Sequence, residues 1–141
     1  MHKKVFLTST DTTIGFISQS QEALDRAKNR SKGKKYIIAL PYLKAINKRV
    51  PKKHKNLVRR AKKITFILSK NYSFRVIKNS KHNLLIKRLG WAYTSSANKS
   101  NEDFDLNYAI ENADVIVCPL KSSKASTIYK LGKDKIIKIR Q

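Results

Sequence analysis

The sequence has 141 residues, 40% of them hydrophobic, which is enough for a single domain spanning residues 1–141 with a buried core. No apolar run is long enough to cross a membrane, and the segment Met1–Leu7 is too short for a signal peptide. The 32 Lys and Arg residues far outnumber the 9 Asp and Glu residues, which gives a net charge of +23. We therefore expect a cytoplasmic protein without a membrane partner whose ligands are anions.

The basic residues are unevenly distributed along the chain. No Asp or Glu occurs between Arg26 and Asn101, and the acidic residues lie before and after this interval. A general preference for lysine could add positive charge, but it would not remove acids from so long a stretch. The distribution favours a nucleic acid or a polyphosphate as the ligand.

Cysteine and histidine give no sign of a disulfide or a metal site. Cys118 is the only cysteine and stands in an apolar run, so we expect a small buried side chain. His2, His54 and His82 are scattered and adjoin no second type of metal ligand, so we expect all three at the surface. The sequence therefore predicts no metal ligands.

The first third of the chain alternates short apolar runs with polar turns. We expect a strand over 4–8, a polar segment over 9–13 and an apolar run over 14–17. A helix is predicted over 18–30, with Ser18 and Gln21 as a capping pair. Its apolar face would hold Ala23, Leu24 and Ala27. The compact apolar run 36–40 predicts a buried strand.

The middle third begins with a short helix that Pro41 would open and Pro51 would end. An amphipathic helix with a basic outer face is predicted over 52–63, and strands over 64–68 and 72–77. A helix capped by Ser80 would follow and end at Gly90. The apolar side chains expected to face the core in these helices are Leu43, Ile46, Leu57, Val58, Ala61, Leu84, Leu85 and Leu89.

The last third opens with Trp91–Tyr93, which we interpret as a buried strand followed by a polar exit, Thr94–Asn98. A short helix capped by Asp105 would bury Leu106, Ala109 and Ile110, and strands are predicted over 115–118, 127–131 and 136–139. Because strands alternate with helices, we expect an α/β domain with a twisted, mixed sheet. Short polar side chains leaving a strand are often ligand contacts in such sheets, although a polar turn would look the same.

Two polar segments are candidates for chemistry. In Ser9–Thr13, hydroxyls surround Asp11, whose carboxylate could brace a turn or orient a ligand. Lys28 and Arg30 begin a basic run at the end of the predicted helix, where cations also complement the helix dipole. Neither of the common glycine-rich phosphate loops is present, so a nucleotide site would need side-chain cations and hydroxyls.

Several segments, in the same order along the chain, resemble motifs of the YrdC-like threonylcarbamoyl-AMP synthases. Residues 9–15 resemble the family's PTDTVYG motif, Lys28-Asn-Arg30 its KxR motif, and Ser95-Ser-Ala-Asn98 its TSAN motif. The other segments that resemble the family's strands are 36–40, 64–68, 74–76, 126–128 and 138–140. The resemblance therefore extends over nearly the whole chain and implies a YrdC-like fold with a basic groove.

The resemblance also implies an enzyme, a nucleotidyltransferase that makes threonylcarbamoyl-AMP and pyrophosphate. Its substrates would be L-threonine, bicarbonate or CO2, and ATP carrying Mg²⁺. The product would go to a tRNA threonylcarbamoyl transferase for the t6A37 modification of tRNA. The basic face of this protein would then contact tRNA or another RNA.

The resemblance assigns roles to particular residues. Lys28 and Arg30 would be catalytic and bind the phosphates and the threonine-derived carboxylate. Ser96 and Asn98 would bind the nucleotide. The remaining expected contacts are Ser126 and Arg140 for ATP, Thr10 and Thr12 for threonine, and Arg75 for threonine and, in a second line, the phosphates.

The chain also departs from the family, which keeps other functions open. Ser9 replaces a proline and Ile14 a tyrosine, which we expect to loosen the threonine pocket. The family's glycine-bearing loop after TSAN is absent, and so is the helix that often precedes the first strand, so we expect a short, divergent member. One alternative is a domain with degraded catalysis that binds tRNA or rRNA, which the basic helix would favour. A second is a related carbamoyl-transfer module.

Overall fold

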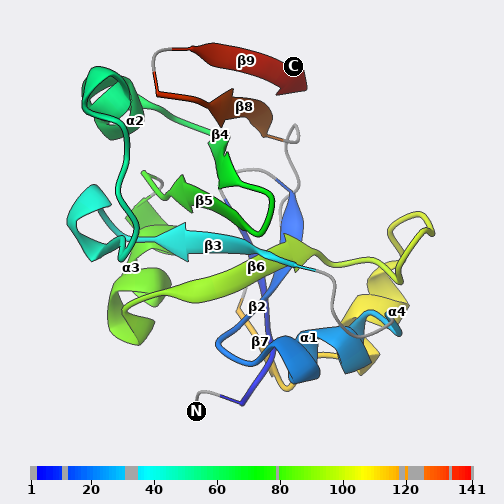
Figure 1. Ribbon diagram of the computed structural model, residues 1–141. Coiled ribbons are helices and arrows are strands. Elements are labelled where there is room, and N and C mark those ends of the chain that lie inside the picture. Colours follow the sequence, from blue (N-terminus) through cyan, green and yellow to red (C-terminus); the bar gives the residue numbers. More distant parts are fainter. Residues whose placement is uncertain are drawn as a thin grey trace.

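The computed structural model describes residues 3–10, 13–30, 35–78, 80–117, 120, 126–133 and 135–140, with only the backbone for 80–83 and 140. Within these residues one mixed sheet has the strand order β7-β1-β2-β6-β3-β5-β4-β8-β9 (Figure 1). The strands are β1 (Phe6–Ser9), β2 (Ile14–Ser18), β3 (Ile37–Leu40), β4 (Ile64–Ser69), β5 (Tyr72–Val76), β6 (Ala92–Ser96), β7 (Val115–Ile116), β8 (Thr127–Leu131) and β9 (Ile136–Arg140). The predicted α/β class and mixed sheet are therefore confirmed.

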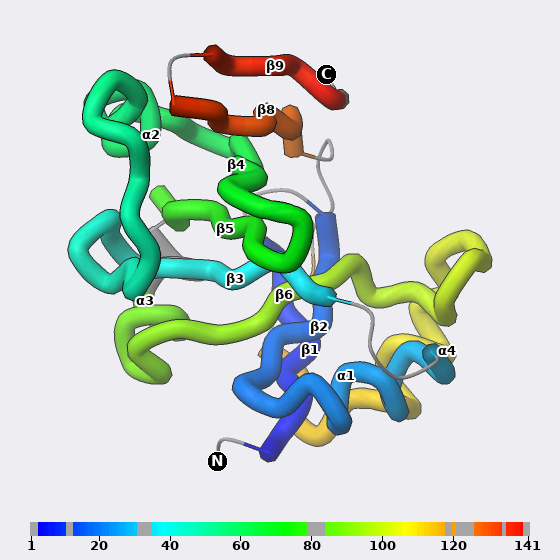
Figure 2. Tube along the Cα trace, viewed as in Figure 1, coloured from blue at the N-terminus to red at the C-terminus, as the bar shows by residue number. Residues whose placement is uncertain are grey.

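Short helices flank this sheet. They are α1 (Gln21–Ala27), α2 (Lys55–Arg60), α3 (Ser80–Leu89) and α4 (Leu106–Glu111), with the 3-10 turns η1 (Leu43–Ala45) and η2 (Lys52–His54). In Figure 2, α1 and α4 lie at one end of the molecule and β8 and β9 at the other. None of the helices in the described part of the chain is both long and apolar enough to cross a bilayer.

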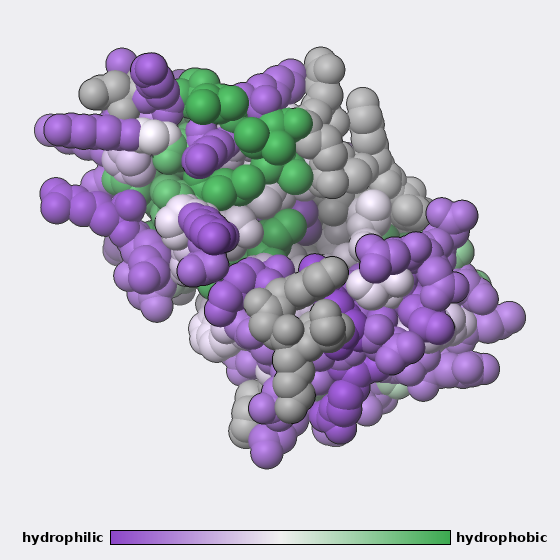
Figure 3. All heavy atoms as spheres, turned by 45° about the vertical axis from the view of Figure 1, so that its right-hand side comes forward, coloured by the Kyte–Doolittle hydropathy of each residue, from purple (hydrophilic) through white to green (hydrophobic). Residues whose placement is uncertain are grey.

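The core is divided among three clusters of buried side chains. One gathers around Phe16 and Leu24 between β2 and α1, and a second around Phe66 and Phe74 on β4 and β5. The third contains Ile17 of β2 and Ile86 of α3. Figure 3 shows apolar surface on the upper part of one face, mainly hydrophilic side chains on the lower part, and a hollow between them.

Two predicted helix starts are wrong. The N-cap of α1 is Ser20, whose hydroxyl accepts from the Ala23 amide at 3.2 Å, whereas Ser18, the last residue of β2, accepts from the Ser20 amide. Pro41 does not open an α-helix, because the segment after it forms only the 3-10 turn η1. The caps predicted at Asp105 and Gly90 are confirmed: Asp105 accepts from the Asn107 amide, and Gly90 has a φ of +89° after α3.

Several helical side chains expected in the core are exposed, because each short helix presents only a narrow face to the sheet. They are Leu57, Leu84, Leu106 and Ile110, of which Leu84 is 67% exposed. The fully buried side chains of the same helices are Val58, Ile86 and Ala109. His54, expected at the surface, is buried, with its Nε2 3.0 Å from the Gly132 carbonyl oxygen. Cys118 and His2, and the side chain of His82, lie outside the described residues.

Candidate active site

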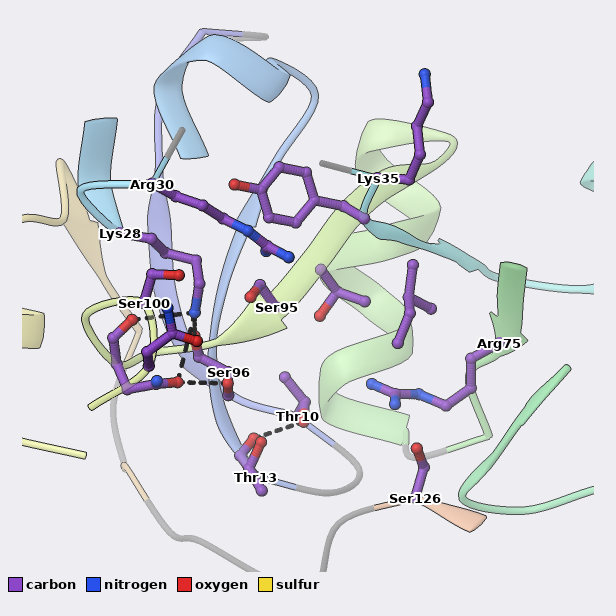
Figure 4. A pocket seen from close by; sticks show the side chains of 15 residues that line it. Thr10, Thr13, Lys28, Arg30, Lys35, Arg75, Ser95, Ser96, Ser100 and Ser126 are labelled. Carbon is purple, nitrogen blue, oxygen red and sulfur yellow. Dashed lines mark hydrogen bonds between the residues drawn. The ribbon is translucent and has the colours of Figure 1, made fainter. Parts of the chain in front are cut away.

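A cavity of about 570 Å³ brings together polar residues from distant parts of the chain (Figure 4). Its volume suits a small-molecule ligand. The lining residues are Thr10, Thr13, Lys28, Arg30, Lys35, Tyr36, Ile37, Arg75, Thr94, Ser95, Ser96, Asn98, Ser100, Asn101 and Ser126. Four of these are basic and none of the described lining residues is acidic, so the charge around the cavity would attract an anion.

The central strand β6 carries the hydroxyls of the cavity. The sequence predicted that the strand would end at Tyr93, but β6 extends to Ser96 and pairs with β2 and β3. Trp91, predicted to be buried in this strand, precedes it and is 38% exposed. The backbone of Thr94 is therefore paired with both neighbouring strands and that of Ser95 with β2, which fixes the segment that carries these hydroxyls.

Lys28 connects the end of α1 to the segment after β6. Its side chain is 4% exposed, and its Nζ donates to the Ser96 carbonyl at 2.8 Å and the Asn98 carbonyl at 3.0 Å. A longer contact of 3.4 Å reaches Asn98 Oδ1. These contacts use the three N–H groups of an ammonium. Lys28 therefore positions the Ser96–Asn98 segment and contributes its charge to the cavity.

The surroundings of Lys28 oppose its protonation. Burial lowers its pKa from 10.5 to about 8, with a smaller contribution from the positive charge of Arg30. Both effects disfavour an added positive charge. An anion in the cavity would offset them and raise the pKa again, so anion binding would favour the protonated form.

Asn98 is held equally firmly. Its Oδ1 accepts from Ser96 Oγ as well as from Lys28, and its Nδ2 donates to the carbonyls of Lys99 and Glu102 at 2.9 and 2.8 Å. The glycine expected in this loop is absent, but Asn101 adopts a φ of +66°, a left-handed conformation that asparagine tolerates. The loop thus keeps a tight turn without glycine.

The end of α1 directs Lys28 and Arg30 into the cavity. Asn29 has a φ of +49°, and the Arg30 amide donates to the Asp25 carbonyl at 2.8 Å, which together form a Schellman cap. The Ser100 amide donates to the Lys28 carbonyl at 2.9 Å, and the Tyr108 hydroxyl donates to the Ala27 carbonyl. The turn is therefore fixed both to its own helix and to the loop after β6.

Arg30 reaches into the cavity beneath an aromatic ring (Figure 4). Its guanidinium carbon lies 4.8 Å from the centre of the Tyr36 ring, a cation–π arrangement. The Tyr36 hydroxyl donates to Asp25 Oδ1 at 2.6 Å, and burial followed by this bond raises the Tyr36 pKa. Among the described residues, no partner accepts the buried Nε–H of Arg30.

The opposite side of the cavity is formed by adjacent strands. Arg75 of β5 is buried, and its Nη1 lies 3.4 Å from Thr65 Oγ1 of β4. The Thr65 hydroxyl is 2.8 Å from the hydroxyl of Ser126, which precedes β8. Figure 4 shows the guanidinium of Arg75 above Ser126 and directed toward the centre of the cavity. A permanently charged group and a hydroxyl thus face Lys28 and Arg30 across the space.

The floor is formed by the turn between β1 and β2. The amide and hydroxyl of Thr10 both donate to the Thr13 carbonyl, which closes the turn. Beyond it, a Cβ on Gly15 would lie only 2.8 Å from the Ser95 carbonyl oxygen, so β2 and β6 approach closely only because residue 15 is glycine. Ile14 is packed in the core cluster around Phe16 and does not line the cavity.

Seven of the predicted site residues lie together in this cavity: Thr10, Lys28, Arg30, Arg75, Ser96, Asn98 and Ser126. Thr12 and the side chain of Arg140 lie outside the described residues, as does Asp11. The sequence did not single out Tyr36, Ile37 or Asn101. A possible signal for Tyr36 was its place directly before a strand and after the basic run.

The donor set suits a ligand that carries phosphate or carboxylate groups. Arginine side chains and hydroxyls are the groups that bind phosphate and carboxylate oxygens where no glycine-rich loop exists. Among the described residues, no group of three or more His, Cys, Asp or Glu could hold a metal ion.

Searches with the whole chain reveal similarity at the level of structure alone. No protein-family model matches the sequence, and no curated protein matches it. A variant of P. abyssi Sua5 superimposes with a TM-score of 0.80 and 16% identity over 98% of this chain and 52% of that one. P. abyssi Sua5 complexed with L-threonine superimposes with a TM-score of 0.77 and 17% identity over 98% of this chain and 50% of that one. The chain thus spans about half the length of these proteins.

Shorter proteins match as well. E. coli YciO superimposes with a TM-score of 0.74 and 16% identity over 98% of this chain and 82% of that one. MTH1692 from Methanobacterium thermoautotrophicum superimposes with a TM-score of 0.72 and 18% identity over 99% of this chain and 80% of that one. At such identities the similarity concerns the fold, and these neighbours are Sua5/YrdC proteins. The chain therefore has the YrdC-like fold that its sequence motifs predicted.

Proposed function

We propose that the protein is an L-threonylcarbamoyladenylate synthase. It would use L-threonine, bicarbonate or CO2, and ATP, and would release pyrophosphate. The product would pass to a tRNA threonylcarbamoyl transferase for the t6A37 modification of tRNA. The observation that supports this function best is the convergence of Lys28, Arg30, Arg75 and Ser126 on one cavity in a YrdC-like fold.

The reaction needs two bond-forming steps. The amino nitrogen of threonine bonds to the carbon of CO2 or bicarbonate, which gives a carbamate. With CO2 the nitrogen releases a proton; with bicarbonate a carbon–oxygen bond breaks and the hydroxide leaves with that proton as water. A carbamate oxygen then bonds to the α-phosphorus of ATP, and the bond from that phosphorus to the bridging oxygen breaks. Pyrophosphate leaves with the electron pair. Mg²⁺ bound to ATP would help neutralise the phosphates.

The residues of the cavity would act by positioning and by neutralising charge. Arg30 and Arg75 lie on opposite sides and would hold the phosphates and the carboxylate between them. Lys28 would add charge without giving up the contacts that hold Ser96 and Asn98. The hydroxyls of Thr10 and Ser126 would orient the threonine and the nucleotide. None of these roles requires a covalent nucleophile.

The similarity to P. abyssi Sua5 supports the choice of the amino acid, since that protein has been seen complexed with L-threonine. A match to HypF in a phosphate- and nucleotide-bound form, which covers 98% of this chain and 22% of that one, supports an anionic ligand in this fold. These similarities concern the fold. Substrate identity therefore needs a direct assay.

Pyrophosphate release from ATP tests the proposal. The purified protein should release pyrophosphate only when both L-threonine and bicarbonate are present, and omission of either should stop release. ATP hydrolysis without threonine would contradict the assignment, and so would the absence of ATP binding.

A matched pair of variants links this activity to the cavity. Arg30→Met removes a lining cation and should lower kcat/KM at least about a hundredfold, because a charge-assisted contact to the transferred group is lost. Arg59→Met removes the same type of residue from an exposed position on α2 and should leave kcat/KM within about twofold. Equal effects of the two substitutions would place the reaction elsewhere.

A further inference from the structure

A second cavity, of about 350 Å³, shares Tyr36 and Lys35 with the first but has a different chemistry. We call it the aromatic cavity. Its other polar and aromatic lining residues are Gln21, Asn47, Lys48, Asn71, Tyr72, Trp91 and Tyr93. Four aromatic rings, three carboxamides and two ammonium groups therefore surround it. The proposed synthase reaction does not use Tyr72, Trp91 or Tyr93.

The pleat of the sheet separates the two chemistries. On paired strands β3 and β6, Ile37 lies opposite Thr94 and both line the first cavity, whereas the next pair, Ile38 and Tyr93, lines the aromatic cavity. Successive residues of a strand point to opposite faces. Thr94 and Tyr93, which are adjacent in sequence, therefore line different cavities, while Tyr36, directly before β3, borders both.

The rings are held in a fixed arrangement. Tyr93 makes an edge-on contact with Trp91, with ring centres 5.1 Å apart and planes at 85°, and lies 6.4 Å from the Tyr36 ring. An edge-on pair cannot cover both faces of both rings. The Trp91 carbonyl accepts from Gln19 Nε2 at 2.8 Å, which fixes the backbone of this exposed tryptophan. Aromatic surface thus remains open at the rim.

The rest of the cavity supplies polar contacts around these rings. The Tyr72 hydroxyl donates to Asn47 Oδ1 at 3.4 Å, and Lys48 Nζ lies 5.8 Å from the centre of the Tyr72 ring. Carboxamides offer both donors and acceptors, as the edges of nucleobases do. Lys35 and Lys48 offer positive charge to phosphates on either side of a bound base.

We propose that the aromatic cavity binds an unpaired base of a single-stranded nucleic acid. Stacking on aromatic side chains within a basic groove is how proteins bind such strands. A strand suits the site better than a free nucleotide, because positive charge continues beyond Lys48. Arg49, Lys52, Lys53 and Lys133 line a neighbouring cavity. The site would bind nucleic acid whether or not the first cavity turns over ATP.

Trp91 is the only tryptophan, so its fluorescence reports on this cavity alone. Titration with a single-stranded oligouridylate of about eight nucleotides should quench it, at concentrations at least about tenfold lower than UMP requires. Added salt should weaken binding of the oligonucleotide much more than binding of UMP. Absence of quenching would overturn the proposal. Equal potency of UMP and the oligonucleotide would also overturn it and assign the cavity to free nucleotides.

Substitutions of Tyr72 test stacking directly. Tyr72→Leu removes a ring and should weaken the oligonucleotide at least about tenfold, whereas Tyr72→Phe keeps the ring and should bind within about threefold of the unchanged protein. Thermal unfolding of both variants checks that the fold is kept. If Tyr72→Leu unfolds, Lys48→Gln replaces it and should reduce the salt dependence by about one phosphate contact. Unchanged binding in a folded Tyr72→Leu protein would refute stacking at this site.

Pyrophosphate release separates this proposal from the synthase. Tyr72→Leu should leave the threonine-dependent release of pyrophosphate within about twofold, since Tyr72 does not line the first cavity. If the protein binds the oligonucleotide but releases no pyrophosphate, the proposed nucleic-acid site is supported and the proposed synthase reaction is contradicted. If the protein releases pyrophosphate but does not bind the oligonucleotide, the synthase reaction is supported and the nucleic-acid site is contradicted.

Discussion

Positively charged side chains lie on two opposite sides of the first cavity, but different elements of the fold hold them in place. We call Lys28, Arg30, Ser96 and Asn98 the α1 wall, and Thr65, Arg75 and Ser126 the β5 wall. The α1 wall joins the end of a helix to a loop through hydrogen bonds between segments about 70 residues apart, such as Lys28 to Ser96. The β5 wall is built on adjacent strands β5, β4 and β8.

On one wall the backbone that holds the site in shape and the side chain that supplies the charge are separate, and on the other a single side chain does both. On the β5 wall, the strands hold their side chains in place, and arginine keeps its charge at all accessible pH values. On the α1 wall, Lys28 supplies both the connection and a charge that burial makes titratable near pH 8. Loss of Lys28 should therefore affect stability as well as binding, and loss of Arg75 chiefly binding.

The largest expected effect comes from replacing each charge by a methionine. Lys28→Met and Arg75→Met should each weaken ATP binding by about tenfold to a hundredfold, because one charge-assisted contact is worth about 1.5–3 kcal/mol. Without ATP, Lys28→Met should also lower the melting temperature, since the Ser96 and Asn98 carbonyls lose their donor. Arg75→Met should lower the melting temperature less, because the contact from Arg75 Nη1 to Thr65 Oγ1 is long, at 3.4 Å.

Calorimetric ATP titrations and thermal unfolding of both variants test this contrast. Arg59→Met, on the exposed side of α2, is the control for removing one positive charge. An equal loss of stability in both variants would show that the β5 wall depends on its charged residue as much as the α1 wall does.

A smaller effect is expected from the packing beneath the α1 wall. Gly15→Ala places a Cβ 2.8 Å from the Ser95 carbonyl oxygen, so β2 and β6 must separate. Forcing extra volume into a packed site costs about 1–3 kcal/mol. Gly132→Ala is the matched control, because its Cβ would meet its nearest atom, the Lys135 carbonyl oxygen, at an ordinary 3.5 Å. Chemical denaturation should show a loss for Gly15→Ala alone, and equal losses would dismiss the close approach as the cause.

The third effect is a dependence on pH. As pH rises through about 8, Lys28 loses its proton and the cavity loses a charge. ATP affinity should therefore fall by up to about tenfold between about pH 7 and pH 9. Lys28→Arg keeps its charge and should show a much flatter profile. A wild-type profile as flat as that of Lys28→Arg would mean that Lys28 does not titrate in this range.

The stability of the free protein should change in the opposite direction. The pKa of Lys28 is lower in the folded chain, so the unfolded chain binds the proton more tightly between about pH 8 and 10.5. The contribution of Lys28 to the free energy of unfolding therefore rises over this window. Denaturation at several pH values, with Lys28→Met as the reference, isolates that contribution.

The sequence predicted most strands of this fold, and the family resemblance pointed to the polar residues of both walls except Thr65, but neither predicted their connections. Apolar runs such as 64–68 predict strands because local burial creates the pattern. The polar half of β6 was missed, since Thr94–Ser96 lacks any apolar alternation although β2 pairs with all of it and β3 with Thr94. The bracing role of Lys28 depends on where two backbone carbonyls point, which no local pattern encodes.

The same reasoning explains the errors at helix ends and the missed cavity. Ser18 and Ser20 both precede the helix closely, but Ser18 is the last residue of β2 and Ser20 is the cap. The aromatic cavity combines Tyr36, Tyr72 and Trp91, which lie far apart in the sequence. Only the order of strands β5, β3 and β6 brings them together.

The smallest expected effect concerns Asn29, which stands between the two cations of the α1 wall. Its φ of +49° lets the chain reverse after α1 so that both Lys28 and Arg30 enter the cavity. Asn29→Ala should cost about 1 kcal/mol, because a left-handed alanine is strained, whereas Asn29→Gly should cost at most a few tenths. Denaturation midpoints measure the difference. If this turn also orients Lys28 and Arg30 toward the cavity, Asn29→Ala should weaken ATP binding a few-fold more than Asn29→Gly does. Equal affinity in the two variants would mean that the Ser100 and Tyr108 contacts hold the turn without help from residue 29.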